Sequence, residues 1–248
     1  MSAAKGVGWH AQFVRDTCRR GMERVYRDLT SAYLEFLGPP EFRDVWDRLS
    51  SVAGFTMDRA ESLCLYSLAA SRGGTVVEVG SYLGRSTAFL AAGVRKAGTG
   101  RVIAIDPHRG GTGDPDSQSA AGEVSTLPLM SHNLRRVGLA DFVTPVVGTP
   151  PEVTGSWAYG EVSLLFVDGL HTADALTSDI TAMLPHLAAD AVVVVDDVHS
   201  YEMAFTPEFP EVGRTLKTLV RAGALPSDRV RVNTYAVFGR RSLRSVVA

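Results

Sequence analysis

From residue 75 onward the chain alternates short apolar runs with segments of helical character. The apolar runs occupy residues 75–80, 101–106, 142–147, 162–167 and 191–196. The helical segments lie between or after these runs, at about 85–97, 122–137, 172–187 and 211–223. Strands that alternate with helices predict a parallel α/β sheet. Because the runs are continuous in Val, Ile and Leu, we expect helices to cover both faces of that sheet.

The two ends of the chain have a different character. Residues 1–72 predict helices, two of them at about 41–50 and 57–71, with breaks at Pro39-Pro40 and Gly73-Gly74. We therefore expect an N-terminal helical extension or lid, residues 1–72, followed by an α/β domain, residues 73–248. The basic residues of the extension predict either a solvated helix face or an interface for a homo-oligomer; they are Arg15, Arg19, Arg20, Arg24 and Arg27. At the other end, residues 229–233 and 235–239 predict an antiparallel edge.

Composition excludes several classes of protein. The 248 residues are 45% hydrophobic, which is enough for a full core. A net charge of −2 argues against an obligate nucleic-acid partner, because phosphate contacts need a strongly basic surface. No run of about 18 apolar residues could span a membrane, and the N-terminus lacks the apolar core of a secretory signal. With only two cysteines, the sequence suits a reducing compartment, so we expect a cytoplasmic protein without a membrane partner.

The first strand is followed by a glycine turn and a helix, Glu78-Val79-Gly80-Ser81-Tyr82-Leu83-Gly84. Gly80 and Gly84 permit a tight turn and a close approach of the backbone to a ligand. Ser86 and Thr87 then open a helix, whose positive end favours an anion such as the carboxylate of a ligand.

A dinucleotide site is the nearest alternative for this turn. Its G-x-G-x-x-G pattern needs a glycine where this chain has Tyr82, which disfavours a pyrophosphate and suits a ligand without phosphate. The next strand ends in Asp106, whose carboxylate could accept hydrogen bonds from ribose hydroxyls. His108 and Arg109, just beyond it, could contact the cofactor or the acceptor, or lie in a solvated loop.

Two further strands end in acidic residues. The fourth ends in Asp168, followed by His171, and the fifth ends in Asp196-Asp197, followed by His199. Carboxylates at neighbouring strand ends would repel one another without a cation. An all-oxygen set suits Mg²⁺, Mn²⁺ or Ca²⁺ better than zinc. The alternative is that these aspartates only cap the turns that follow them.

These motifs together resemble those of the class I O-methyltransferases that depend on S-adenosylmethionine (SAM), whose carboxylate would be the anion at the helix that begins with Ser86 and Thr87. The similarity spans about residues 75–240 and is closest to the metal-dependent branch, which includes catechol O-methyltransferases and bacterial macrolide- and aminocoumarin-sugar O-methyltransferases. It implies a Rossmann-like fold with a mostly parallel seven-stranded sheet. Its cofactor contacts would be Glu78, Gly80, Ser81, Tyr82, Gly84, Ser86, Asp106, Thr149 and Asp168. Its metal ligands would be Asp168, Asp196 and Asp197.

The chain departs from these relatives at two positions. The catechol-type enzymes have Asn where this chain has Asp197, and the sugar-modifying enzymes often have an acid where it has Leu170. The general base is therefore open. His171 and His199 are the candidates because histidine titrates near neutral pH, although each could instead orient a carboxylate or lie on the surface.

The favoured hypothesis is a metal-assisted transfer of a methyl group from SAM to a hydroxyl of a small metabolite, for example a natural-product sugar. A second hypothesis keeps the fold and SAM but changes the reaction to C- or N-methylation or to a reaction without methyl transfer. A third is a catalytically silent binding subunit.

Overall fold

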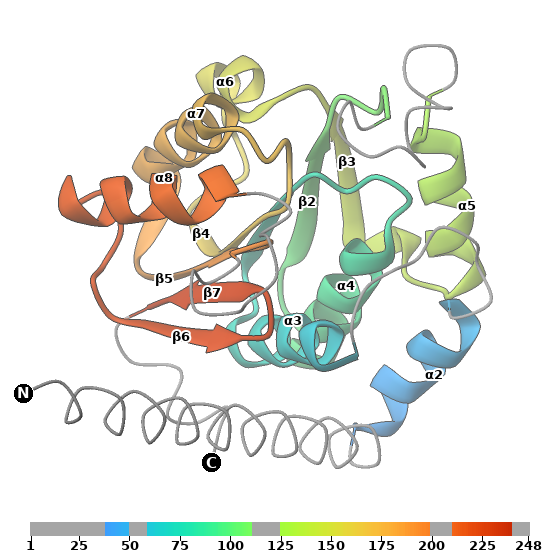
Figure 1. Ribbon diagram of the computed structural model, residues 1–248. Coiled ribbons are helices and arrows are strands. Elements are labelled where there is room, and N and C mark those ends of the chain that lie inside the picture. Colours follow the sequence, from blue (N-terminus) through green and yellow to red (C-terminus); the bar gives the residue numbers. More distant parts are fainter. Residues whose placement is uncertain (1–37, 50–58, 111–124, 199–209, 240–248) are drawn as a thin grey trace, which may run out of the picture. The chain divides into compact units, whose positions relative to one another are not determined.

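The computed structural model describes residues 38–49, 59–110, 125–198 and 210–239. All seven predicted strands are present: β1 (Thr75–Val79), β2 (Arg101–Asp106), β3 (Val143–Val147), β4 (Val162–Val167), β5 (Leu187–Val195), β6 (Arg229–Val232) and β7 (Tyr235–Phe238). They form one sheet in the order β3-β2-β1-β4-β5-β7-β6. The first five strands are parallel, and β7 pairs antiparallel to both β5 and β6. The mostly parallel seven-stranded Rossmann-like sheet is thus confirmed (Figure 1).

The described helices also follow the predicted pattern. They are α2 (Pro40–Leu49), α3 (Arg59–Arg72), α4 (Arg85–Ala97), α5 (Leu127–Arg136), α6 (Pro150–Val153), α7 (Ala173–Met183) and α8 (Pro210–Arg221). Gly73 and Gly74 follow α3 with φ of 59° and 69°, as expected of residues that end a helix. The short helix α6 was not predicted. It is a single turn after β3, too short to show helical periodicity in the sequence.

Two predicted boundaries were wrong. The helix expected over 172–187 ends at Met183, and after a 3₁₀ turn (Leu184–His186) β5 begins at Leu187 instead of 191. Pro185 accounts for this, because it has no N–H to continue the α-helical hydrogen bonds. The helix expected from residue 122 begins at Leu127, where Pro128 suits the first turn.

Helices cover both faces of the sheet. One apolar core joins α2, α3, α4 and α5 to the face that carries Val76, Ala104 and Phe166. The second core joins α7 and α8 to the face that carries Val77, Ile103 and Leu165 (Figure 1). Successive strand residues alternate between these cores, which explains why the strands are continuously apolar.

The compact unit that contains the sheet extends from Pro40 to Ala248. It includes α2 and α3, which the sequence analysis grouped with the N-terminal extension 1–72. α3 packs along α4, and Phe42 of α2 packs on Phe89 of α4 with ring centroids 5.2 Å apart. The residues of the proposed lid and oligomer interface before Gly38 lie outside the described residues, so both roles stay predictions.

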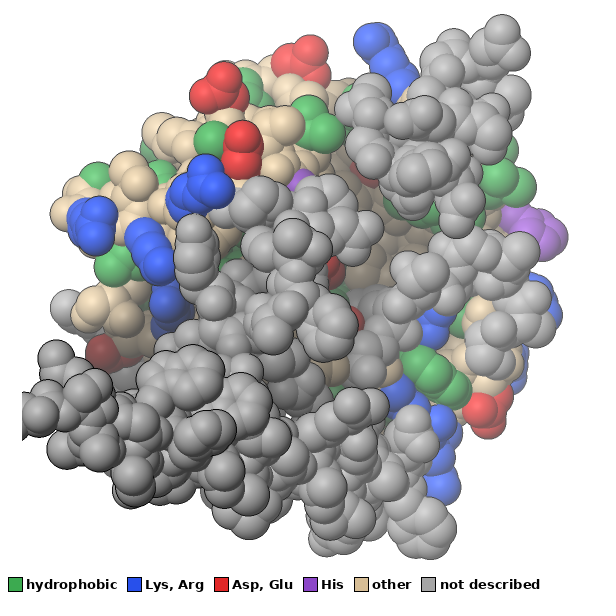
Figure 2. Space-filling model, viewed as in Figure 1, with side chains coloured by type: hydrophobic (Ala, Val, Ile, Leu, Met, Phe, Trp, Pro, Cys, Tyr) green, Lys and Arg blue, Asp and Glu red, His purple; other side chains and the backbone are tan. Residues whose placement is uncertain are grey.

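Two observations on the described residues concern membranes and nucleic acids. No helix in the described ranges is long and apolar enough to cross a membrane. On the face drawn in Figure 2, the described residues carry acidic and basic side chains intermixed. The expected absence of a nucleic-acid partner stays a prediction.

The strand order determines where a ligand site can form. From β1 the chain proceeds through β2 to β3 on one side, and β4 then lies on the other side of β1. In open α/β sheets, ligands bind at the carboxyl ends of the strands where the order reverses. The carboxyl ends of β1 and β4 are therefore the expected location.

Candidate cofactor and cation site

The glycine turn after β1 is as tight as predicted. Gly80 and Gly84 have φ of 87° and 84°, and Tyr82 between them has φ of 42°. A Cβ added at Gly80 would come well under 3.0 Å from the carbonyl oxygen of Asp168, and one added at Gly84 would lie 2.9 Å from Met130 Cγ. The turn therefore runs between the end of β4 and α5 with no room for side chains at either glycine.

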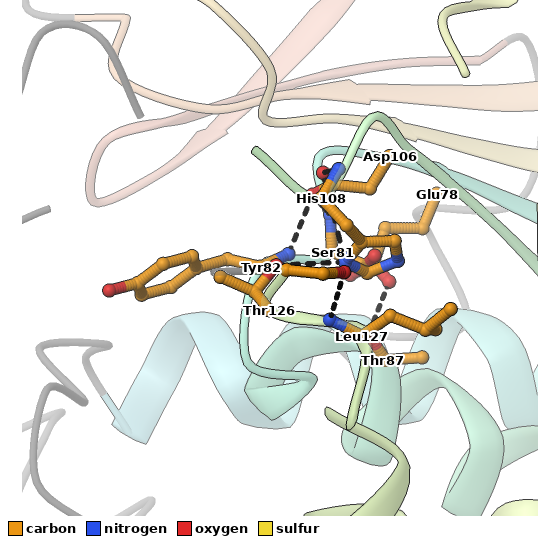
Figure 3. A network of polar contacts seen from close by, with 9 residues as sticks. Glu78, Ser81, Tyr82, Thr87, Asp106, His108, Thr126 and Leu127 are labelled. Carbon is orange, nitrogen blue, oxygen red and sulfur yellow. Dashed lines mark hydrogen bonds and ion pairs between the residues drawn. The ribbon is translucent and has the colours of Figure 1, made fainter. Parts of the chain in front are cut away.

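Asp106, at the end of β2, stabilises this turn through hydrogen bonds. Its Oδ2 accepts hydrogen bonds from the backbone amides of Ser81 and Tyr82, both at 2.8 Å, and Oδ1 accepts one from the His108 amide at 2.6 Å (Figure 3). A carboxylate offers about four lone pairs, so three are occupied and Oδ1 retains one for a ligand. Asp106 thus shapes the glycine turn, a role that its position in the sequence did not indicate.

His108 does not lie in a solvated loop, which was one of the two readings of this position. It is 2% exposed, its Nδ1 is 2.9 Å from Thr126 Oγ1, and its carbonyl accepts a hydrogen bond from the Thr126 amide at 3.2 Å (Figure 3). Burial lowers the pKa of His108, which favours the neutral imidazole. Arg109, the next residue, is exposed.

Glu78 lies fully buried beneath the turn. Its Oε2 accepts a hydrogen bond from Thr87 of α4, and burial raises the pKa of Glu78 to about 7, although the hydroxyls of Ser86 and Thr87 act in the opposite direction. The Thr87 hydroxyl is therefore bound to protein, while Ser86 is buried in the first turn of α4.

Several buried polar atoms around the turn have no hydrogen-bond partner among the described residues. They are Glu78 Oε1, Ser81 Oγ and His108 Nε2. Buried polar groups are nearly always paired, and unpaired ones in a cluster are typical of a site that receives a polar ligand. The turn thus fits a ligand that carries hydroxyl, amino and carboxylate groups.

The end of β3 forms the neighbouring wall. Gly148 donates a hydrogen bond to the Asp106 carbonyl at 3.1 Å, so the ends of β2 and β3 lie together. Thr149 begins α6: its amide and hydroxyl are 2.8 and 2.9 Å from Glu152 Oε2. Both polar groups of Thr149 are therefore engaged locally, and its exposed neighbour Val147 offers an apolar surface.

A second group of side chains gathers at the ends of β4 and β5. Asp168, His171 and Asp197 each offer an atom within 4.8 Å of the others. His171 Nε2 lies 3.4 Å from Asp168 Oδ1 and 3.3 Å from Asp197 Oδ2. Burial, together with the nearby charge of Asp197, raises the pKa of Asp168 well above its usual range. Asp197 adopts a φ of 55°, a strained conformation for a residue other than glycine.

This donor set fits a divalent cation. Carboxylate oxygens are the ligands that Mg²⁺, Mn²⁺ and Ca²⁺ prefer, and two acids held this close favour a positive charge between them. The imidazole nitrogen is better tolerated by Mn²⁺ than by Mg²⁺ or Ca²⁺.

Asp196 is the remaining member of the predicted trio, and its part in a cation site stays a prediction. The predicted trio was Asp168, Asp196 and Asp197, but the group that shares one 4.8 Å cluster contains His171 in place of Asp196. Asp196 Oδ1 instead accepts hydrogen bonds from the Asp197 amide and, at 2.7 Å, from the Thr234 hydroxyl. Thr234 and its second partner, Glu61, were missed, because neither stands near a motif. His199 lies outside the described residues.

Comparisons with known proteins agree with this arrangement. Residues 77–198 match a family model described as a methyltransferase domain. The chain carries a methyltransferase domain. The matched segment begins in β1 and ends just after Asp197, so it contains both groups of side chains described above.

Solved structures share the fold of this methyltransferase. Cofactor-bound Rv0187 from MTB is 20% identical, with a TM-score of 0.61 over 87% of this chain and 97% of that one. An O-methyltransferase from Bacillus cereus in complex with SAH is 14% identical, with a TM-score of 0.60 over 86% and 97%. TomG, an O-methyltransferase from Streptomyces achromogenes involved in tomaymycin synthesis and solved with SAM, is 18% identical, with a TM-score of 0.55 over 84% and 94%. At these identities the likeness establishes the class I methyltransferase fold.

Proposed function

We propose that this methyltransferase transfers the methyl group of SAM to a hydroxyl oxygen of a small metabolite, with the help of a divalent cation. The observation that carries the proposal is the convergence of Asp168, His171 and Asp197 within 4.8 Å at strand ends next to the glycine turn. The O-methyltransferases from Bacillus cereus and Streptomyces achromogenes, which share the fold, support the choice of oxygen as acceptor.

The cofactor would lie across the ends of β1, β2 and β3. Ser86 and the first amides of α4 would hold its carboxylate, because the first intrahelical hydrogen bond runs only from Ala88 to Gly84. The free lone pair on Asp106 Oδ1 would accept one ribose hydroxyl. Thr149 and Val147 would border the adenine. Glu78, Gly80, Ser81, Tyr82 and Gly84 would shape the space between these groups, and Asp168 would face the reacting end.

Asp168 and Asp197 would hold the cation, with Asp196 beside them. A bound divalent cation lowers the pKa of an acceptor hydroxyl and fixes its direction. Nε2 of His171 lies 3.4 Å from Asp168 Oδ1 and 3.3 Å from Asp197 Oδ2, which places it at the same site.

His171 is the base that the geometry favours. As the O–H bond breaks, its proton would pass to Nε2, which in this role carries no proton and is not a ligand of the cation. The oxygen then forms a bond to the methyl carbon as the carbon–sulfur bond breaks, and S-adenosylhomocysteine leaves. Holding both reactants in line can contribute about 7–11 kcal/mol in favourable cases. His199 stays the alternative base.

The test measures S-adenosylhomocysteine formation with a panel of hydroxylated acceptors, with and without a chelator. We expect EDTA to stop turnover while SAM binding, followed by calorimetry, persists, and Mg²⁺ or Mn²⁺ to restore turnover. Asp197→Ala, which removes the side-chain oxygen ligands, should reduce the rate at least about 100-fold, whereas Asp141→Ala, at an exposed acid before β3, should match wild type. Full activity in EDTA would exclude the role of the cation.

The same assay separates the alternative functions. Fragmentation of the product by mass spectrometry locates the added methyl group on oxygen, carbon or nitrogen. A reaction without release of S-adenosylhomocysteine would indicate that SAM has only a structural role. The absence of both turnover and SAM binding would indicate a silent subunit.

A further inference from the structure

Asp196 has only one carboxylate oxygen available to a cation. Its Oδ1 accepts hydrogen bonds from the Asp197 amide and from the Thr234 hydroxyl. Two donors occupy the two lone pairs of that oxygen. Oδ2 is therefore the atom that can contribute to the site beside Asp168 and Asp197.

Thr234 is held firmly by the sheet. It lies in the two-residue turn between β6 and β7, where Val232 pairs with Tyr235. Its carbonyl accepts a hydrogen bond from the Val198 amide at 2.9 Å, which ties the turn to the chain just beyond β5. Tyr235 is fully buried, and its ring lies 5.4 Å from that of Phe166. The Thr234 hydroxyl is thus presented to Asp196 from a rigid element.

Glu61 contacts Thr234 from another part of the fold. It lies in the first turn of α3 and is 7% exposed. Its Oε1 is 2.6 Å from Thr234 Oγ1 and accepts a hydrogen bond from the Thr234 amide at 3.2 Å. Thr234 Oγ1 therefore lies within 2.7 Å of two carboxyl groups, those of Glu61 and Asp196, and its single proton is shared between them.

Glu61 is a buried acid near a group that already contains Asp168, Asp196 and Asp197. Polar side chains that lie behind the ligands of a metal site commonly fix the orientation of those ligands. The contacts from Glu61 through Thr234 to Asp196 have that arrangement.

We propose that Thr234 and Glu61 are positioning residues of the cation site. Thr234 holds Asp196 so that Oδ2 faces the cation, and Glu61 holds Thr234. Asp196 Oδ1 also accepts a hydrogen bond from the Asp197 amide. The contacts that hold Asp196 therefore also support the left-handed backbone conformation of Asp197. This inference rests on the proposed cation-dependent function, and neither residue needs to touch the cation, the cofactor or the acceptor.

The test measures the binding of Mn²⁺ alone, by electron paramagnetic resonance, to the full chain without cofactor or acceptor. Loss of an outer contact of this kind typically lowers metal affinity about 10- to 100-fold, so Thr234→Val should raise the Kd for Mn²⁺ by that factor. Thr234→Ser, which keeps the hydroxyl, should bind like wild type. Thr218→Val is the matched control, because the Thr218 hydroxyl is exposed and, among the described residues, donates to the Arg214 carbonyl of the same helix, α8.

Glu61→Ala tests the second residue independently of any folding defect in the turn. As a single substitution it should weaken Mn²⁺ binding about 10-fold. In the double variant with Thr234→Val it should cause little further loss of Mn²⁺ affinity, because the two residues act through one contact. Equal Kd values for wild type, Thr234→Val and Glu61→Ala would overturn the inference while leaving the proposed function intact. Wild-type protein that binds no Mn²⁺ would overturn both.

Discussion

Gly80 joins the glycine turn after β1 to the end of β4, where the proposed cation site lies, and substituting it should damage both. Its φ of 87° is unfavourable for any residue with a side chain, and the position of an added Cβ is occupied by the carbonyl oxygen of Asp168. In Gly80→Ala, either β1 must move away from the end of β4 or the turn must adopt another conformation.

The magnitude can be worked out with a matched control. The left-handed backbone costs an alanine about 1–2 kcal/mol, and overpacking against a fixed neighbour typically costs a further 1–3 kcal/mol. Gly80→Ala should therefore lower the free energy of unfolding by about 2–5 kcal/mol. Gly98, at the end of α4, has a φ of 73° but nothing within 4 Å of an added Cβ. Gly98→Ala should show only the backbone cost of about 1–2 kcal/mol.

The assays are urea unfolding followed by circular dichroism and calorimetric titration with S-adenosylhomocysteine. Gly80→Ala should lose more than about 10-fold in affinity, since a displacement that costs 1.4 kcal/mol of binding energy changes Kd tenfold. Gly98→Ala should bind like wild type. Equal unfolding energies for the two variants, or unchanged binding in Gly80→Ala, would refute the close packing of the turn on Asp168.

Three further predictions follow from buried contacts of the same turn. The pKa of Glu78 rises from 4.5 to about 7 on folding, so its stabilising effect is complete below pH 4.5 and is lost as the pH rises through 7. Glu78→Gln should remove this pH dependence and be up to about 3 kcal/mol more stable than wild type at pH 8 by urea unfolding, yet bind SAM more weakly. Asp106→Asn, which places an amide group against backbone N–H donors, should lower the free energy of unfolding by about 2–3 kcal/mol and weaken S-adenosylhomocysteine binding at least tenfold by calorimetry. Asn133→Ala leaves the Leu83 carbonyl without its 2.9 Å partner and should cost about 1–3 kcal/mol, whereas unchanged stability would show that water replaces the contact.

Much of the fold follows from patterns within short segments. A strand such as β4, with the apolar sequence Val162–Val167, can be buried only between two helical layers, and the helices between the strands determine that the strands run parallel. Boundaries were less predictable, because Pro185 ends α7 while the apolar pattern continues into β5. The turn at α6 depends on the capping contacts between Thr149 and Glu152, which leave no periodic signal in the sequence.

The residues of the candidate site could be predicted from the sequence, but their contacts could not. The glycine turn, Asp106 and the acids at the ends of β4 and β5 were predicted because each ends a recognisable strand. The sequence did not indicate that Asp106 would bind the amides of the turn, or that His108 would be buried against Thr126. Both contacts join separate segments of the chain, so no pattern within one short segment predicts them.

Sequence by itself determined which elements form and which polar residues stand at their ends, because periodicity and turn chemistry act over a few residues. Tertiary structure alone decided how those side chains are used. Asp196 and Asp197 are adjacent and chemically identical. Asp197 lies against His171, whereas Asp196 contacts Thr234, which in turn contacts Glu61. Glu61 and Thr234 are 173 positions apart in the sequence, and only the packing of α3 against the β6–β7 turn brings them into contact.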